Sequence, residues 1–472
     1  MKTKTKLLDL PIGKALVTLS VPIIFANLLQ TAYQIIDTFW VGRLGPEAVA
    51  AVSLSFPFIF LMIALGGGLA IAGTILVAQY KGSKNYSQLN AVAGQAIIMT
   101  AIISAVLSII GYFLTGPAIS LMNPAPEVFG GAINYLQITF IGLVSFFGFF
   151  ATQALMRGVG EVKIPMYIVA GTVLLNLIFD PLFIFGWGPI PPMGVAGAAA
   201  ATIATQTLAF VISIGFLLTG KYDIRLTWQD FRLNPPLIMR MVKLGLPASI
   251  QQGTQALGFT AITFLVSGFG TQALAAYGIG GRLMSFFIIP ANGLADAVST
   301  LVGQNIGAQR HNHAEQTAKY GVAATFSVLT ILGLAVYYLA APIAALFVPN
   351  NIQTISASAH FIRIIAFTLG FIGVQMVVLG ALRGAGDMSS SLVIGLIDLF
   401  VFKLLLIFIL TRYLGFAEDG IWWSFAIANV GSAIVASIWF GLGKWKKVKI
   451  IDHDTEAQVD IIEEAIMDEG HV

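Results

Sequence analysis

The stretch LSVPIIFANLLQTAYQIIDTFW, residues 19–40, lies inside the first long apolar run of the chain. Its polar side chains are spaced by seven, three, four and three residues, which places them on one helical face: Ser20, Asn27, Gln30, Gln34 and Asp37. A carboxylate at membrane depth is costly unless it faces a protein interior or a water-filled cavity. We therefore interpret Asp37 as functional, whereas the amides could instead only join neighbouring helices. Pro22 is a potential bend in this helix, because proline removes a backbone donor.

The composition is that of a polytopic membrane protein. The chain is 57% hydrophobic and 10% charged, against roughly 45–50% and 25% in soluble domains. Apolar runs of about 20 residues, each long enough to cross about 30 Å of hydrocarbon as a helix, recur along the chain. They are too long for barrel strands and lack two-residue alternation. The sequence predicts twelve transmembrane helices and an all-α fold, with spans near residues 15–41, 48–79, 90–115, 130–156, 165–186, 194–219, 244–268, 273–303, 320–341, 355–382, 389–411 and 420–442.

The basic residues indicate the orientation of these spans. If the N-terminus faces the cytoplasm, 20 of the 25 Lys and Arg residues lie on the inner side, and only Arg43 and Arg412 lie outside. The remaining three, Arg282, Arg363 and Lys403, fall within spans. By the positive-inside rule, both termini are expected to be cytoplasmic, in the plasma membrane of a prokaryote.

The second half of the chain repeats the first. At a shift of 225 residues Pro22, Gln30, Gln79 and Gly82 fall on Pro247, Gln255, Gln304 and Gly307, and at a shift of 226 Arg157-Gly158 falls on Arg383-Gly384. We predict an N-lobe at 1–219, a cytoplasmic linker at 220–243, a C-lobe at 244–443 and a cytoplasmic acidic tail at 444–472. Six helices per repeat start both halves on the same side, so a pseudo-two-fold axis should run along the membrane normal. This architecture is typical of transporters.

The candidate carboxylates belong to the first half alone. Asn176 and Asp180 are four residues apart on one helical face, and their repeat partners are Phe402 and Leu406. The helical rise places four oxygen-bearing side chains at similar depth in the outer part of this half: Asp37, Asn176, Asp180 and Thr202. Two carboxylates in a low dielectric cannot comfortably both stay ionised, so one should take a proton or both should share a hard cation such as Na⁺. Asp180-Pro181 could instead be only a helix-end cap.

The chain resembles the multidrug and toxic compound extrusion (MATE) family over residues 10–445, and three motifs carry this resemblance. They are Ile36-Asp37-Thr38-Phe39-Trp40-Val41-Gly42, the paired turns at Arg157-Gly158 and Arg383-Gly384, and Asn176-Leu177-Ile178-Phe179-Asp180-Pro181 followed by Gly194-Val195-Ala196-Gly197-Ala198-Ala199. The resemblance implies antiport, in which H⁺ or Na⁺ enters while organic, often cationic or aromatic, compounds leave. It implies that Asp37, Asn176, Asp180 and Thr202 form a first-half cation site and that Pro22 is the family's bending proline.

The chain differs from one branch of the family at two acidic positions. The branch of the family that couples through its second half uses acidic residues in the seventh and tenth helices, and the matching positions here are Gln255 and Ile372. The chain therefore resembles the DinF-like branch. Candidates for the substrate path are Asn27, Gln30, Tyr33, Gln34, Gln252 and Gln255.

The leading hypothesis is a cation-coupled multidrug efflux antiporter with no cofactor. We expect small organic substrates and membrane lipids as partners, no nucleic acid, and a monomer. A flippase for lipid-linked precursors shares a similar layout, but its relatives usually need a cationic cavity and the inward-facing basic residues here are few. A channel or a non-transporting receptor is a third alternative. An enzyme is disfavoured, because neither a nucleophile elbow nor a His-Glu-x-x-His motif occurs.

Two further charges lie within the eleventh span. Asp398 and Lys403 are five residues apart, which is about 140° around an α-helix, so they are not expected to face each other. Each should then need a partner elsewhere, such as Arg363 or Asp296.

Overall fold

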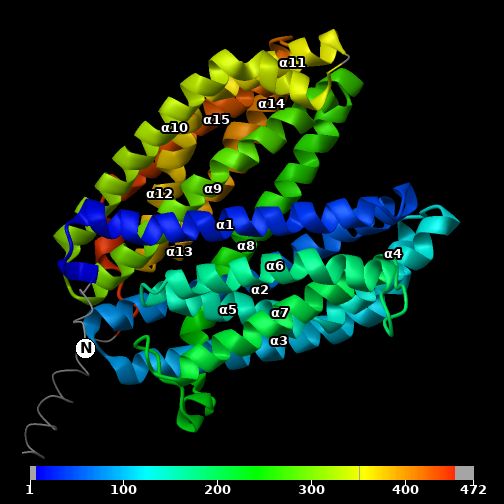
Figure 1. Cartoon of the computed structure of the whole chain (residues 1–472). Helices are drawn as coiled ribbons and strands as arrows, with labels where there is room; N and C mark the ends of the chain where they lie inside the picture. Colours follow the sequence, from blue (N-terminus) through cyan, green and yellow to red (C-terminus); the bar gives the residue numbers. More distant parts are fainter. Residues whose placement is uncertain (1–6, 350, 452–472) are drawn as a thin grey trace, which may run out of the picture.

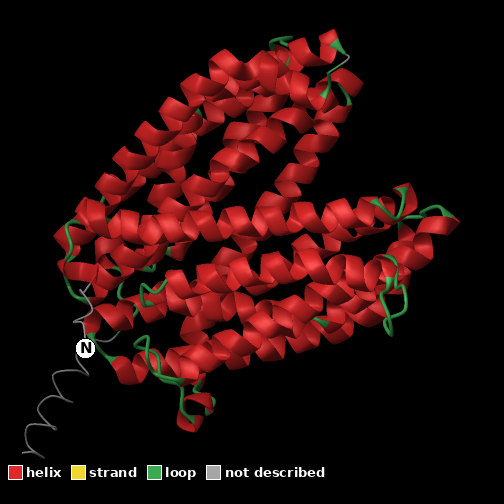
Figure 2. Ribbon diagram, viewed as in Figure 1, coloured by secondary structure: helices red, strands yellow, loops and turns green. Residues whose placement is uncertain are grey.

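The computed structural model describes residues 7–349 and 351–451, which form helices joined by loops (Figures 1 and 2). The first half contains α1 (Ile12–Gly42), α2 (Pro46–Ser83), α3 (Tyr86–Leu121), α4 (Pro126–Ile141), α5 (Leu143–Gly158), α6 (Lys163–Phe185) and α7 (Val195–Leu218). The second contains α8 (Pro235–Ser267), α9 (Thr271–Gly307), α10 (His311–Phe347), α11 (Ile352–Ala366), α12 (Leu369–Ala385), α13 (Met388–Leu396), α14 (Leu406–Phe408) and α15 (Asp419–Gly441). Short 3₁₀ helices at η1 (Leu7–Asp9), η2 (Trp228–Phe231) and η5 (Lys444–Lys447) and π-helices at η3 (Ile397–Leu405) and η4 (Ile409–Tyr413) complete the described chain.

These helices are consistent with twelve membrane crossings. Among the described residues, nine segments are long and apolar enough to span a membrane alone, one of them being Met388–Tyr413. Two bent pairs, α4 with α5 and α11 with α12, add two crossings. The twelfth is α8, whose 33 residues are less apolar because Gln251, Gln252 and Gln255 lie within it. It begins inside the segment 220–243 that we expected to be a linker.

The two bent crossings break at matching places in the repeats, although the sequence predicted each as one unbroken span. They bend by 50° near Gly142 and by 51° near Thr368, 226 residues later. The side chain of Ile203 occupies the space where a Cβ on residue 142 would lie. Thr368 Oγ1 accepts a hydrogen bond from Asn429 Nδ2 at 2.9 Å and donates one to the Ile365 carbonyl. Neither site carries a proline, so each break is accompanied by a contact with a neighbouring helix and not by a missing backbone donor.

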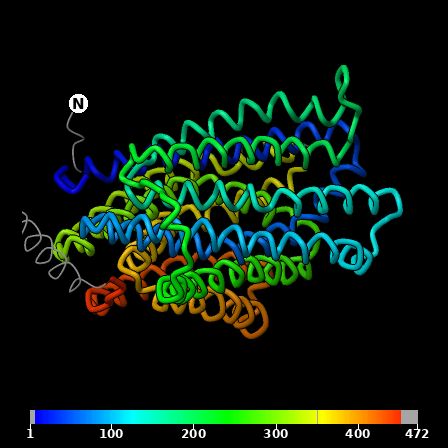
Figure 3. The backbone as a smooth tube through the Cα atoms, turned by 90° about the horizontal axis from the view of Figure 1, so that it is seen from below, coloured from blue at the N-terminus to red at the C-terminus, as the bar shows by residue number. Residues whose placement is uncertain are grey.

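The helices form two bundles, an N-lobe of α1–α7 and a C-lobe of α8–α15 (Figure 1). The bundles meet near the N-terminal end of α1 and diverge toward the ends that carry α4 and α11. Figure 3 shows that the helix axes run in roughly one direction, as expected of helices that cross the same membrane. Across the lobe interface, α2 packs against α8 and α9, and α1 packs against α9. The prediction of an all-α, two-lobed repeat protein is confirmed.

The lobes approach most closely where α2 crosses α9. Gly82 faces the backbone carbonyl of Gln304, and Gly307 faces that of Gln79. A Cβ on either glycine would overlap a backbone oxygen of the other lobe. Glycine thus permits the close backbone contact that helix pairs in lipid use in place of a hydrophobic driving force.

Two hydrogen bonds accompany this crossing and are related by the repeat. Gln79 Nε2 donates to the Gly384 carbonyl at 3.1 Å, and Gln304 Nε2 donates to the Gly158 carbonyl at 2.9 Å. Because Gln304 and Gly384 are the repeat partners of Gln79 and Gly158, each lobe reaches into the other in the same way. This reciprocal pair is direct evidence of the pseudo-two-fold axis.

An ion pair adds to the same interface without such symmetry. Arg157 Nη1 lies 3.3 Å from Asp296 Oδ2, across the lobes, and the Arg383 guanidinium is close enough to interact with the same carboxylate. Asp296 is therefore paired with arginine at the interface and is not the partner that we expected for the charges of the eleventh span.

Those charges pair with each other, so the expectation that they face apart was wrong. Lys403 Nζ lies 2.7 Å from Asp398 Oδ2, and Ser432 Oγ donates to Asp398 Oδ1 at 2.6 Å. The expectation assumed α-helical turns, whereas residues Ile397–Leu405 form a π-helix. A π-helix joins residues i and i+5 by hydrogen bonds and brings side chains of that spacing together.

We expect Gly307→Ala to weaken the contact between the lobes, because the added methyl overlaps the Gln79 carbonyl. Overpacking of this kind costs about 1–3 kcal/mol, and thermal unfolding of the purified protein should show a lower melting temperature. Gly278→Ala is the control, because it lies in the same helix and a Cβ there meets open space. Equal melting temperatures for the two variants would contradict the predicted overlap.

Asp398→Asn should also lower the melting temperature, because it leaves the Lys403 ammonium without its carboxylate. Breaking a buried ion pair costs about 3–5 kcal/mol, and the partial exposure of these side chains, 14% and 23%, places the expected loss near the lower figure. The double variant Asp398→Asn/Lys403→Met should recover most of the loss. If the double variant melts no higher than Asp398→Asn alone, the loss of stability does not come from the unpaired Lys403 ammonium.

Candidate cation site in the N-lobe

Three neighbouring helices carry the site residues that the sequence predicts. Asp37 lies near the end of α1, Asn176 and Asp180 lie in α6, and Thr202 lies in α7. α6 packs against both α1 and α7. The fold therefore brings the four residues to one region of the N-lobe.

Asn176 and Asp180 form the buried part of this site. Both side chains are fully buried, and Asn176 Nδ2 donates to Asp180 Oδ1 at 2.6 Å. α6 continues through Pro181 to Phe185, so Asp180 lies inside the helix. Its carboxylate bonds a side chain of its own helix, which differs from the helix-end cap that we kept as an alternative.

Tyr33 joins α1 to α7 at the same place. Its hydroxyl lies 2.8 Å from Thr205 Oγ1, and Thr202 is also within its hydrogen-bonding reach. Tyr33 is buried, although we assigned it to the substrate path from its sequence position. The sequence did not lead us to Thr205. Its position one helical turn beyond Thr202, on the same face of α7, could have indicated it.

The site is marked by buried oxygen atoms that lack a donor. In the described part of the chain, these acceptors include Asp37 Oδ1, Asn176 Oδ1, Asp180 Oδ2 and Gln206 Oε1. Gln206, one turn after Thr202 in α7, was not predicted. Buried polar atoms normally have a partner, and these atoms accept hydrogen bonds but cannot donate them. What would satisfy them is a donor or a cation: a water molecule, a proton on a carboxylate, or a hard cation that prefers oxygen ligands.

The two carboxylates are also close enough for charge effects. The charge of Asp37 acts on Asp180, and both charges act on Tyr33 and on the buried Tyr135 of α4. Like charges at short range in a low dielectric disfavour double ionisation. The chemistry that this arrangement supports is the uptake and release of one proton or one small cation, with no reacting group for bond cleavage.

The remaining predicted residues lie along α1 and α8. Pro22 is buried, and α1 runs through it as one helix. Asn27 and Gln30 are half-buried and Gln34 is exposed. In α8, Gln252 lies against Gly67 of α2 and Gln255 is exposed. Their role in a substrate path stays a prediction.

Comparison with known proteins agrees with this architecture. The sequence model of the MatE family matches residues 22–182 and 247–409, one segment in each lobe. The probable multidrug resistance proteins YoeA and YpnP of Bacillus subtilis are 28% and 29% identical, covering 91% and 93% of this chain and 93% and 96% of their own lengths. A MOP superfamily transporter from Pyrococcus furiosus shares the fold, with a TM-score of 0.87 at 24% identity over 95% of this chain and 100% of its own. Because the MatE match covers more than half of the sequence, in both repeats, this chain belongs to the MATE family of multi-pass membrane transporters.

Proposed function

We propose that this chain is a cation-coupled multidrug efflux antiporter of the DinF-like branch, driven by H⁺ or Na⁺ bound in the N-lobe. The observation that carries the proposal is the set of buried, donor-less oxygens on Asp37, Asn176 and Asp180. Their repeat partners are Ile262, Phe402 and Leu406, which offer no oxygen. The exported compounds are organic, often cationic or aromatic, in keeping with the names of the B. subtilis relatives.

Coupling requires that cation and substrate stabilise different states, since a ligand that binds two states equally shifts nothing. The lobes meet on the side where the N-terminal end of α1 lies (Figure 1). With both termini in the cytoplasm, as the positive charges favour, this is the outward-facing state. Cation entry from outside removes the remaining negative charge of the pair Asp37 and Asp180, and the neutralised site favours a different position of α1.

Pro22 supplies the flexible point through which α1 responds. Ile24, two residues further along α1, lies against Gly293 of α9. A bend at Pro22 would change this contact and so the fit between the lobes. The protein works as a monomer in the plasma membrane of a prokaryote and needs no cofactor.

Asp37→Asn should abolish cation-driven efflux while the protein remains in the membrane. The amide keeps the shape of the side chain but cannot exchange a proton or supply a negative charge to Na⁺. Everted membrane vesicles given separate H⁺ and Na⁺ gradients, with a fluorescent organic cation, measure the loss and identify the coupling ion. Glu47→Gln, which changes an exposed carboxylate just beyond the same end of α1, is the control and should leave efflux intact. Normal drug resistance in cells that carry Asp37→Asn would refute the proposal.

The same site should link cation binding to substrate binding. In the wild type, raising the coupling-ion concentration should weaken the binding of a fluorescent organic cation to purified protein, by about tenfold within the usual range of such couplings. Linkage is reciprocal, so bound substrate should weaken cation affinity by the same factor. In Asp180→Asn the substrate affinity should no longer depend on the ion. An unchanged dependence would mean that coupling lies elsewhere in the chain.

A further inference from the structure

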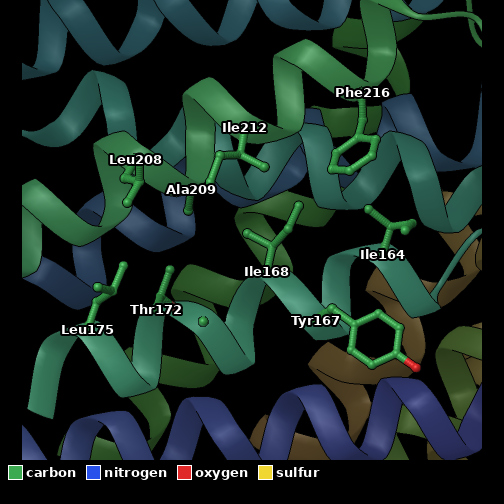
Figure 4. A pocket seen from close by; sticks show the side chains of 10 residues that line it. Ile164, Tyr167, Ile168, Thr172, Leu175, Leu208, Ala209, Ile212 and Phe216 are labelled. Carbon is green, nitrogen blue, oxygen red and sulfur yellow. The ribbon is translucent and has the colours of Figure 1, made fainter.

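A groove between α6 and α7 opens on the side of the N-lobe (Figure 4). Its volume is about 230 Å³, and its walls are almost entirely apolar. Ile168 and Ala209 at its floor are buried, whereas Tyr167 and Ile212 at its edges are 62% and 41% exposed. Both helices span the membrane, so the mouth of the groove faces lipid.

The second lobe closes the matching crease with hydrogen bonds. At a shift of 226 residues, Thr172 and Ile164 of the groove correspond to Asp398 and Ser390. In the C-lobe, Asp398 Oδ1 accepts from Ser432 of α15, and Trp439 Nε1 of α15 donates to Ser390 Oγ at 2.9 Å. The two lobes therefore differ at this place, and the hydrogen bonds that join the helices in the C-lobe have no counterpart, among the described residues, at Thr172 and Ile164 of the groove.

The length of the groove matches one leaflet of a bilayer. From Ile164 to Leu175 the lining of α6 rises about 16 Å at 1.5 Å per residue, and half of a hydrocarbon core is about 15 Å. A lipid acyl chain has this length and this apolar character.

One end of the groove is basic. The exposed Lys163 directly precedes Ile164, and Lys221, also exposed, follows α7 beyond Phe216. The neighbouring carboxylate of Glu161 accepts the backbone N–H groups of Lys163 and Ile164 at 3.0 and 3.2 Å, so its hydrogen bonds go to the backbone at the start of α6. We propose that the groove binds one acyl chain of an anionic phospholipid, with the lipid phosphate beside Lys163.

Such a lipid would lie directly behind the candidate cation site. Ile168 and Ala209 pack with Tyr33 and Val173 in one buried cluster, and Tyr33 contacts Thr205. The bound chain would complete the packing of the two helices that carry Asn176 and Thr202. The lipid site itself does not depend on the proposed antiport, because it follows from the shape and charge of the groove.

Native mass spectrometry of the purified full-length protein with dioleoyl-phosphatidylglycerol tests the proposal. Gly171 lines the groove, and a Cβ there meets no atom within 4 Å, so Gly171→Leu should fill the groove without disturbing the protein. Gly215→Leu on α7 is the matched control, since a Cβ there also meets open space but residue 215 does not line the groove. The wild type and Gly215→Leu should each retain one tightly bound lipid more than Gly171→Leu.

A second comparison tests the head-group contact. Lys163→Gln should lower the preference for phosphatidylglycerol over phosphatidylcholine about fivefold, the equivalent of about 1 kcal/mol per basic residue at a membrane surface. The smaller replacement Gly171→Ala, which should reduce lipid retention only partly, keeps the test valid if the leucine variant fails to fold. Equal lipid retention by the wild type and the Gly171 variants would overturn the proposal. So would a Gly171→Leu variant that loses affinity for a transported dye but keeps its lipid, because the groove would then hold substrate.

Discussion

The crossing of α2 and α9 is the contact on which the arrangement of the two lobes depends. Lipid tails are as apolar as the surfaces of transmembrane helices, so two helices gain no hydrophobic free energy when they associate in a bilayer. They associate instead through close packing and hydrogen bonds. Gly82 and Gly307 supply the close packing, and Gln79 and Gln304 supply the hydrogen bonds by donating to carbonyls of the opposite lobe. Each of these packing contacts and hydrogen bonds contributes only a small part of the free energy that joins the lobes.

The two lobes share this scaffold but deal with buried charge in different ways. In the C-lobe, Asp398 is neutralised by Lys403 of its own helix and bonded by Ser432. In the N-lobe, Asp37 and Asp180 have no cationic side chain among the partners that the structure gives them within the described residues, and one oxygen of each lacks any donor. The carboxylate of the C-lobe is thus satisfied within the protein, whereas the two carboxylates of the N-lobe are not. This difference is the basis on which we propose a cation site in the N-lobe alone.

Periodic and compositional features of the sequence predicted most of the fold. The twelve spans, the repeat and the grouping of Asp37 with Asp180 follow from helical spacing and apolar length, which the membrane enforces strictly. Features set by contacts distant in sequence were missed. The break at Thr368, which Asn429 supports, is such a feature. The π-helix that joins Asp398 to Lys403 was missed for a different reason, because its wider turn leaves no pattern of its own in the sequence. Thr205 and Gln206 were missed because hydroxyl and amide side chains in a span serve equally well as helix contacts.

α1 connects the candidate site to the lobe interface. It packs against α6 within its own lobe and against α9 across the interface. Asp37 and Pro22 are separated by 15 residues, which is about 22 Å of helix. A rigid helix carries a displacement over this distance, and a proline gives that helix one preferred point of bending. The contact of Ile24 with Gly293 of the other lobe lies two residues past this proline. α1 thus carries both the candidate charge and a contact with the opposite lobe, which is why our proposal assigns the coupling to this helix.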